Sequence, residues 1–253
     1  MQQWSTIIQD SATIIALAVA VTNRITVPRK SGMAPPFGRR FPGTSGIAVN
    51  PVRRCLCLSI DVQGYGVNDD VRQRKIQSDL LDLLDCAAAR AGLDRSRWNR
   101  QPQGDAELAL IPADELLDRV VGAFILELAA ALSRYNAERD PVERMRLRLA
   151  FDDGPVDLAP NGFAGQAVVR VSRLVNARQL RQALNLADRA DLAVLLSDGV
   201  YRDWIHSGRS LIRPGSCRRL AVAEKEYVAD AWLWLPAADV HRLPADPRGW
   251  DRD

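Results

Sequence analysis

From residue 53 onward, the apolar positions follow two periods, which predict strands and helices in a definite order. Continuous apolar runs at 55–60 and 192–196 are typical of buried strands. Apolar residues spaced three or four positions apart predict long helices at about 69–91 and 114–140. Residues 145–151 alternate strictly, which predicts a strand with Arg146 and Arg148 on its outward face.

The remaining patterns complete the order β-α-β-β-α-β-β-α-β-α-β-β. They predict strands at 98–103, 105–111 and 156–158, with a bend at Gly154-Pro155, helices at 165–177 and 201–205, and a closing hairpin at 219–235. This order predicts an α+β domain with a mixed, largely antiparallel sheet and helices packed on one face.

The two ends of the chain differ from this central part. Residues 1–48 contain proline- and glycine-rich stretches such as 28–36, so we expect a flexible N-terminal leader. The folded domain is expected to span 49–236, and the polar segment 237–253 is expected to be a loose tail.

Composition excludes several classes of function. With 47% apolar and 26% charged residues the chain is typical of a globular protein, and its net charge of +3 gives no electrostatic reason to expect nucleic-acid or membrane binding. The longest N-terminal apolar run, 14–21, is too short to span a bilayer, so no membrane span is expected. Four cysteines and two histidines lack the spacing of a zinc site or a catalytic triad. We interpret the cysteines as buried free thiols of a cytoplasmic protein.

Two aspartates beside glycines are the strongest candidates for chemistry. Asp61 ends the first strand and enters the turn Val62-Gln63-Gly64-Tyr65, whereas Asp105 follows Gly104 and opens another apolar run. A helix between two strands can bring such end carboxylates side by side. Paired carboxylates suit Mg²⁺ or Mn²⁺ that carries a nucleotide's phosphates. The alternative is structural, since aspartate before glycine is also ordinary turn chemistry.

This layout resembles the catalytic domain of class III nucleotidyl cyclases over about residues 54–235. Residues 61–65 match the family's D-[IV]-x-G-[FY] turn, and Gly104-Asp105 matches its second metal aspartate. The resemblance implies a ferredoxin-like fold in which Asp61 and Asp105 bind two Mg²⁺ or Mn²⁺ ions. It also implies that the backbone N–H groups of residues 62–65 hold the phosphates of a nucleoside triphosphate.

Further matches lie in the second half of the chain. Residues 165–173 are similar to the family's G-x-x-V-N-x-A-x-R helix, which places Arg173 at the arginine that stabilises charge on the α-phosphate. Lys225 stands at the family's triphosphate-binding lysine. The resemblance implies a homodimer in which one subunit supplies Asp61 and Asp105, and the other supplies Gln101, Arg173 and Lys225.

Three positions depart from the family. Val169 replaces the asparagine that orients the ribose, while Gln101 and Gly162 replace the lysine and aspartate that read adenine. These departures leave open an altered base preference, a different hydrogen-bond pattern for a purine, or a protein that binds nucleotide without turnover. The expected reaction is conversion of a nucleoside triphosphate to a 3′,5′-cyclic mononucleotide for signalling. The alternatives are a catalytically silent nucleotide-binding or dimerisation module, and a structural protein that keeps only the fold.

Overall fold

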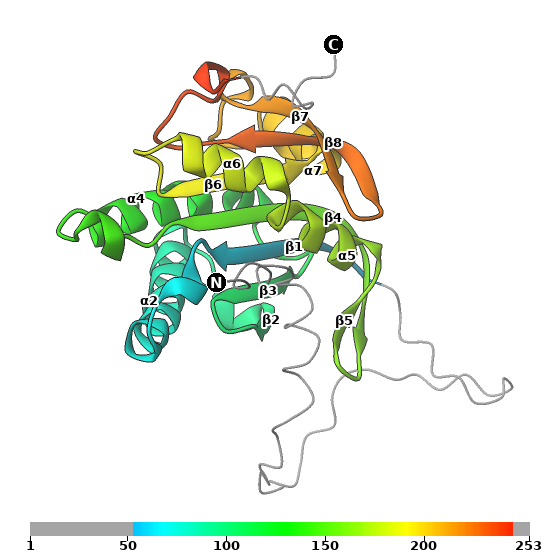
Figure 1. Cartoon of the computed structure of the whole chain (residues 1–253). Coiled ribbons are helices and arrows are strands. Elements are labelled where there is room, and N and C mark those ends of the chain that lie inside the picture. Colours follow the sequence, from blue (N-terminus) through cyan, green and yellow to red (C-terminus); the bar gives the residue numbers. More distant parts are fainter. Residues whose placement is uncertain (1–52, 245–253) are drawn as a thin grey trace, which may run out of the picture. The chain divides into compact units, whose positions relative to one another are not determined.

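Eight strands form one mixed sheet in the computed structural model, which describes residues 53–244 (Figure 1). The strands follow the spatial order β2–β3–β1–β4–β6–β8–β7, and the short β5 pairs with the end of β4. Strands β4 and β6 pair in parallel, whereas the other neighbours are antiparallel. The bounds are β1 (Arg53–Val62), β2 (Asn99–Pro102), β3 (Ala106–Ile111), β4 (Leu147–Ala159), β5 (Gly162–Ala164), β6 (Leu192–Ser197), β7 (Arg218–Glu224) and β8 (Tyr227–Trp234).

The helices connect these strands largely as predicted. Asp69 caps the first long helix, because its side chain accepts a hydrogen bond from the Arg72 N–H at 2.8 Å. The second long helix begins at Leu117 and passes through a π-helical stretch at 120–124 before its regular part. The helices are α2 (Asp70–Arg90), α3 (Leu117–Arg119), α4 (Ile125–Asn136), α5 (Gln166–Val175), α6 (Arg178–Leu186) and α7 (Asp198–Val200).

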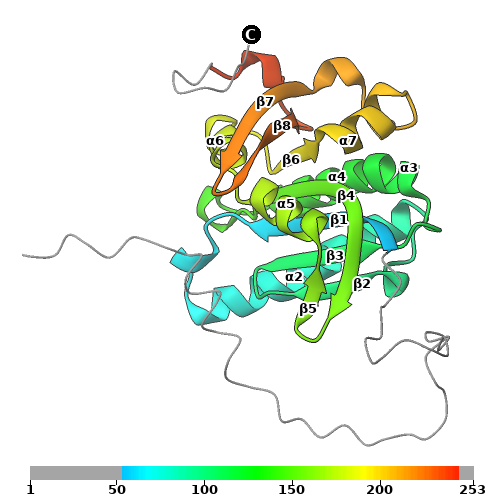
Figure 2. The same ribbon diagram turned by 90° about the vertical axis from the view of Figure 1, so that its right-hand side faces the viewer.

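Helices cover both faces of the sheet, which corrects the expectation of a single helical face. Leu56, Leu58 and Ile60 of β1 pack into a core with α2 and α4, whereas Cys57 faces a second core with α5 and α6. Figure 2 shows α5 and α2 on different sides of the sheet. The apolar character of β1 on both faces explains why both must be covered. The α+β class with a mixed sheet is confirmed.

Two further differences concern the second half of the domain. Gly154-Pro155 does not end the strand, because β4 continues to Ala159 before the turn into β5. Gly165, the residue before α5, packs against β4 so closely that a Cβ there would lie 2.6 Å from the Pro155 carbonyl oxygen. The predicted order also omits α6, whose buried side chains include Leu180 and Leu184.

The ends of the chain are described only in part. The expected leader, residues 1–48, lies outside the described residues, as do residues 245–253. Part of the expected loose tail is packed: Val240 and Leu243 are buried, and Arg218 donates to both of their carbonyls. None of the helices within residues 53–244 is long and apolar enough to cross a bilayer.

Candidate active site

Asp61 and Asp105 lie next to each other at one end of the sheet. Asp61 stands near the end of β1, opposite Ala106 of the antiparallel β3, and Asp105 immediately precedes β3. The Val62 N–H donates to the Asp105 carbonyl at 3.1 Å, which extends the pairing of the two strands. The antiparallel register therefore brings together two carboxylates that are distant in the sequence.

The two carboxylates interact electrostatically. Burial raises the pKa of Asp105 to about 6, and the negative charge of Asp61 adds to the rise. Burial also raises the pKa of Asp61, against the opposing effect of the positive charges of Arg148 and Arg181. A cation between two partly desolvated carboxylates would relieve this repulsion.

The donor chemistry of this pair fits Mg²⁺ or Mn²⁺. Within residues 53–244 no cluster of three or more carboxylate, histidine or cysteine side chains occurs, so Asp61 and Asp105 have no third acidic or imidazole partner. Mg²⁺ is commonly held by one or two carboxylates together with water and substrate phosphates. The remaining ligands would therefore come from the backbone, from water or from the substrate.

Arg148 is a member of the site that the sequence analysis did not identify. It stands opposite Asp61 in the β1–β4 register, and its guanidinium donates to Asp61 Oδ1 and to the Val175 carbonyl. Its side chain is only 10% exposed, and its Nε has no hydrogen-bond partner. Strand alternation predicted its face of β4 correctly. It did not predict that α5 covers this face, so the expected outward arginine is buried beside a carboxylate.

The turn after β1 has a more limited capacity to bind phosphate than expected. Gly64 adopts a φ of +76°, which favours glycine. The Val62 and Gln63 N–H groups already donate within the chain, to Asp105 and to the Arg146 carbonyl at 2.8 Å. Of residues 62–65, Gly64 and Tyr65 therefore remain the better candidates for N–H contacts to a phosphate.

Side chains of this turn contact two helices. The Tyr65 hydroxyl accepts a hydrogen bond from Gln77 of α2 at 2.6 Å, and Gln63 Nε2 donates to Asn185 Oδ1 of α6 at 2.5 Å. Both contacts fix the turn between the two helical layers.

Arg173 and Lys225 lie together, away from the two aspartates. Arg173 on α5 donates through Nε and Nη2 to Glu226 Oε1, at 3.0 and 2.8 Å. Lys225 and Glu226 form the two-residue turn between β7 and β8, where Lys225 has a φ of +54°. The cationic neighbours of Asp61 are Arg148 and Arg181 instead. Figure 1 shows the arrowhead of β1 and the β7–β8 hairpin toward opposite ends of the sheet.

Gln101 and Gly162 are adjacent in space. Gln101 lies on β2, whereas Gly162 on β5 has a φ of +111°. A Cβ at position 162 would overlap the side-chain amide of Gln101. The structure thus joins two of the three positions that depart from the cyclase pattern. The third, Val169 on α5, is 36% exposed.

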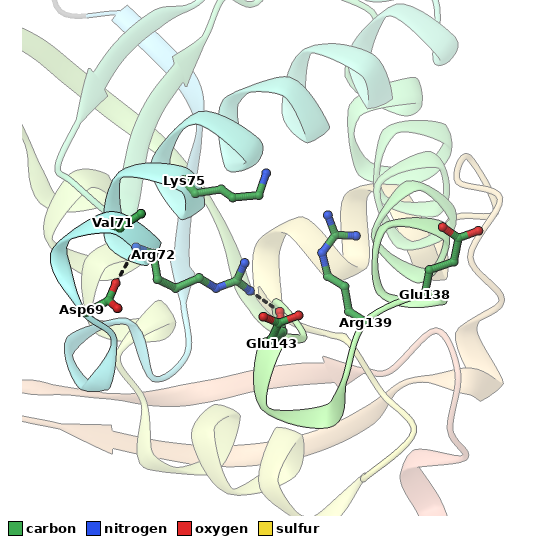
Figure 3. Close-up of a pocket in the computed structure, with 7 residues that line it drawn as sticks. All are labelled: Asp69, Val71, Arg72, Lys75, Glu138, Arg139 and Glu143. Carbon is green, nitrogen blue, oxygen red and sulfur yellow. Dashed lines mark hydrogen bonds between the residues drawn. The ribbon is translucent and has the colours of Figure 1, made fainter.

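A separate hollow of about 480 Å³ opens between the start of α2 and the segment after α4. Figure 3 shows Arg72 and Lys75 on one side and Arg139 on the other, with three acidic residues around the same space. The balanced charges indicate no particular ligand, and none of the candidate site residues lines the hollow.

Similar solved structures are nucleotidyl cyclases. The chain is similar to an adenylate/guanylate cyclase/hydrolase from Silicibacter pomeroyi, with a TM-score of 0.54 and 21% identity over 73% of this chain and 98% of that one. The chain is also similar to a bacterial light-regulated adenylyl cyclase, with a TM-score of 0.51 and 12% identity over 75% of this chain and 93% of that one. Its similarity to the guanylyl cyclase Cya2 has a TM-score of 0.50 and 13% identity over 77% of this chain and 98% of that one.

These likenesses show the fold of class III adenylyl/guanylyl cyclase domains. No protein-family model and no curated protein matches the chain.

Proposed function

We propose that the chain is a nucleotidyl cyclase that converts a nucleoside triphosphate to a 3′,5′-cyclic mononucleotide and pyrophosphate. The ribose 3′-oxygen bonds to the α-phosphorus and loses its proton, while the bond from that phosphorus to the bridging oxygen breaks. One observation supports this proposal above all: Asp61 and Asp105 lie close enough for their charges to interact, next to the glycine turn, in a domain with the fold of known cyclases.

Asp61 and Asp105 would hold two Mg²⁺ or Mn²⁺ ions. When bound, such ions lower the pKa of a coordinated hydroxyl and neutralise phosphate charge. The chain's own residues hold the carboxylates in place: β1 and β3 fix their separation, and both carboxylates are partly buried, which leaves them open to a metal ion and its ligands. Gly64 and Tyr65 present backbone N–H groups at the same end of the sheet.

Arg148 is suited to exchange partners when the substrate binds. Its guanidinium donates to Asp61, and its buried Nε lacks an acceptor. A phosphate oxygen would satisfy that donor, and it would release Asp61 to act as a metal ligand. Arg148 therefore serves as an internal counter-ion for Asp61.

The proposed active form is a homodimer. Asp61 and Asp105 have Arg148 and Arg181 as cationic neighbours in their own chain, whereas Arg173 and Lys225 lie with Glu226. A second copy would bring its Arg173 and Lys225 to the first copy's carboxylates, where Arg173 would stabilise charge on the α-phosphate. Exposed apolar side chains support such a partner: Leu158 and Val228 are 58% and 66% exposed.

The base would be read by neutral groups. Gln101 can both donate and accept hydrogen bonds, and Gly162 leaves room beside its amide. This pairing supports a base preference different from that of adenylyl cyclases. Val169 offers no hydrogen bond to the ribose.

A second candidate function is a silent nucleotide-binding module. Val169 supports it, and so does Arg173, whose guanidinium is already paired with Glu226. Such a module would bind nucleotide and metal without producing a cyclic product.

Incubation of the purified full-length chain with each of the four common nucleoside triphosphates and Mn²⁺ tests both candidates. The cyclase predicts a cyclic product and pyrophosphate with at least one triphosphate, and loss of that product in Asp61→Ala. Nucleotide binding without product would favour the silent module. If no triphosphate binds and none is converted, both candidates are wrong.

A further inference from the structure

Helix α6, which was absent from the predicted order of elements, is held beside the candidate active site by hydrogen bonds from Gln63 and from Arg146. Its Asn185 accepts the hydrogen bond from Gln63 of the glycine turn. At its C-terminal end, Arg146 of the segment before β4 donates to the carbonyls of Leu184, Ala187 and Ala190. An arginine that satisfies several terminal carbonyls fixes the end of a helix. The position of α6 relative to the turn is therefore well determined.

Arg181 lies one helical turn before Asn185 and so shares its face of α6, the face toward the glycine turn. Its side chain is exposed, and its guanidinium donates to the Asn176 carbonyl at 2.6 Å. Among residues 53–244 it forms no ion pair with a carboxylate. A carbonyl uses one of the five N–H donors and leaves the positive charge uncompensated.

Hydrogen bonds on two sides place Arg181 near the carboxylate pair. Asn185, on the same face of α6, accepts from Gln63, which lies two residues after Asp61. Asn176, which accepts from Arg181, follows Val175, whose carbonyl accepts from Arg148, the arginine that contacts Asp61. Arg181 therefore lies beside the place where the proposed function puts the phosphates, and its positive charge opposes the rise in the pKa of Asp61. An exposed arginine with free donors beside such a place is suited to bidentate contact with phosphate oxygens.

We propose that Arg181 binds the terminal phosphates of the substrate and the released pyrophosphate, from the same subunit as Asp61 and Asp105. The inference rests on the proposed function, since it assigns a ligand within that same site. It makes the α6 face a phosphate-binding surface of the subunit that carries the metal carboxylates. Arg181 would thus bind the substrate equally before and during the reaction, which affects KM more than kcat.

The competing interpretation is purely structural. Arg181 donates to Asn176, which follows the last residue of α5, and this contact alone could justify an arginine. Arg181→Gln separates the two roles, because a glutamine amide can still donate to a carbonyl but carries no charge. Arg189→Gln is the matched control, since Arg189 is an exposed arginine beyond the end of α6.

The test is calorimetric titration of full-length protein with inorganic pyrophosphate in the presence of Mn²⁺, together with KM, kcat and melting temperature. We expect Arg181→Gln to bind pyrophosphate about tenfold more weakly and to raise KM for the triphosphate by a similar factor, with kcat within about threefold. The melting temperature and the Arg189→Gln affinity should stay at their wild-type values.

Equal pyrophosphate affinity in wild type and Arg181→Gln would overturn the inference and leave the proposed cyclase intact. An equal loss in Arg189→Gln would also overturn it, because general surface charge would then explain the effect. If Arg181→Gln has a lowered melting temperature, the pyrophosphate affinity of Arg181→Lys separates the two roles. Wild-type-like affinity in Arg181→Lys supports the charge role, and affinity as weak as that of Arg181→Gln contradicts it. A wild-type protein that binds neither triphosphate nor pyrophosphate would remove the proposed function and this inference together.

Discussion

The two ends of the candidate site are built on different principles. The proposed metal end comprises the charged side chains of Asp61, Asp105 and Arg148 and the neutral turn 62–66, and hydrogen bonds between strands hold it together. The proposed ribose and base end, which comprises Gln101, Gly162 and Val169, consists of neutral groups, one without a side chain and one unable to form hydrogen bonds.

This difference indicates separate tasks. Charges that are fixed in a partly desolvated place can stabilise a transition state, because they need little reorganisation during the reaction. Neutral groups contribute selectivity between ligands of similar charge. Changes at the metal end should therefore alter rate or stability, and changes at the base end should alter which nucleotide is preferred.

The largest effect is expected from Asp105→Asn. The substitution keeps size and shape but removes a charge from the proposed metal site, so turnover should fall by about 100-fold or more. The rate of cyclic product formation measures this. Asp82→Asn, at an exposed position on α2, is the matched control and should keep wild-type activity. If Asp105→Asn keeps activity within twofold of wild type, the Asp105 charge is not needed for turnover, and the proposed metal end is wrong.

Arg148→Gln should destabilise the metal end. Its removal leaves the largely buried Asp61 carboxylate without its counter-ion, at a cost of about 2 kcal/mol in the free energy of unfolding, somewhat below the range for fully buried pairs. Urea denaturation without divalent ions measures this loss. The double variant Asp61→Asn/Arg148→Gln should recover part of it, because no unpaired charge remains. Additive losses would show that the two side chains do not depend on each other.

Gln101→Ala should change selectivity at the base end. Loss of a hydrogen-bonding amide is expected to alter the ratio of kcat/KM between the preferred and the next-best triphosphate by about tenfold, with a smaller change in the best rate. A panel of triphosphates under identical Mn²⁺ concentrations measures the ratio. Gln103→Ala, an exposed neighbour beyond β2, should leave the ratio unchanged. A uniform fall with all triphosphates would place Gln101 among the groups that determine rate.

The smallest effect concerns pH. Because the pKa of Asp105 is raised to about 6, the folded protein retains a proton that the unfolded chain loses near pH 4. Folding stability from this group is therefore fully present below about pH 4 and is lost as pH rises through about 6.

Metal-free wild type should thus lose about 1 kcal/mol more than Asp105→Asn between pH 4.5 and 7.5, a value reduced because the carboxyl is only half-buried. Thermal or urea denaturation in chelator at both pH values gives the comparison. Parallel pH profiles for the two proteins would contradict the raised pKa.

Local patterns were sufficient for most elements of the fold. The apolar runs predicted β1, β6 and the long helices, since burial and chain periodicity act over a few residues. The helix α6 was missed because its apolar repeat, which includes Leu180, Ala183 and Leu184, extends over only 9 residues. Strand β4 was predicted too short because glycine and proline are usual turn residues.

By itself the sequence determined the α+β class and placed Asp61 at the end of one strand and Asp105 at the start of another, and the antiparallel register of β1 and β3 brings the two together. Only the tertiary structure revealed Arg148 and Arg181 beside that pair and Gln101 beside Gly162. Alternation along a strand specifies the face on which a side chain lies, whereas the residues that meet it across that face depend on how distant segments pack. The charge balance of the site arises from that packing.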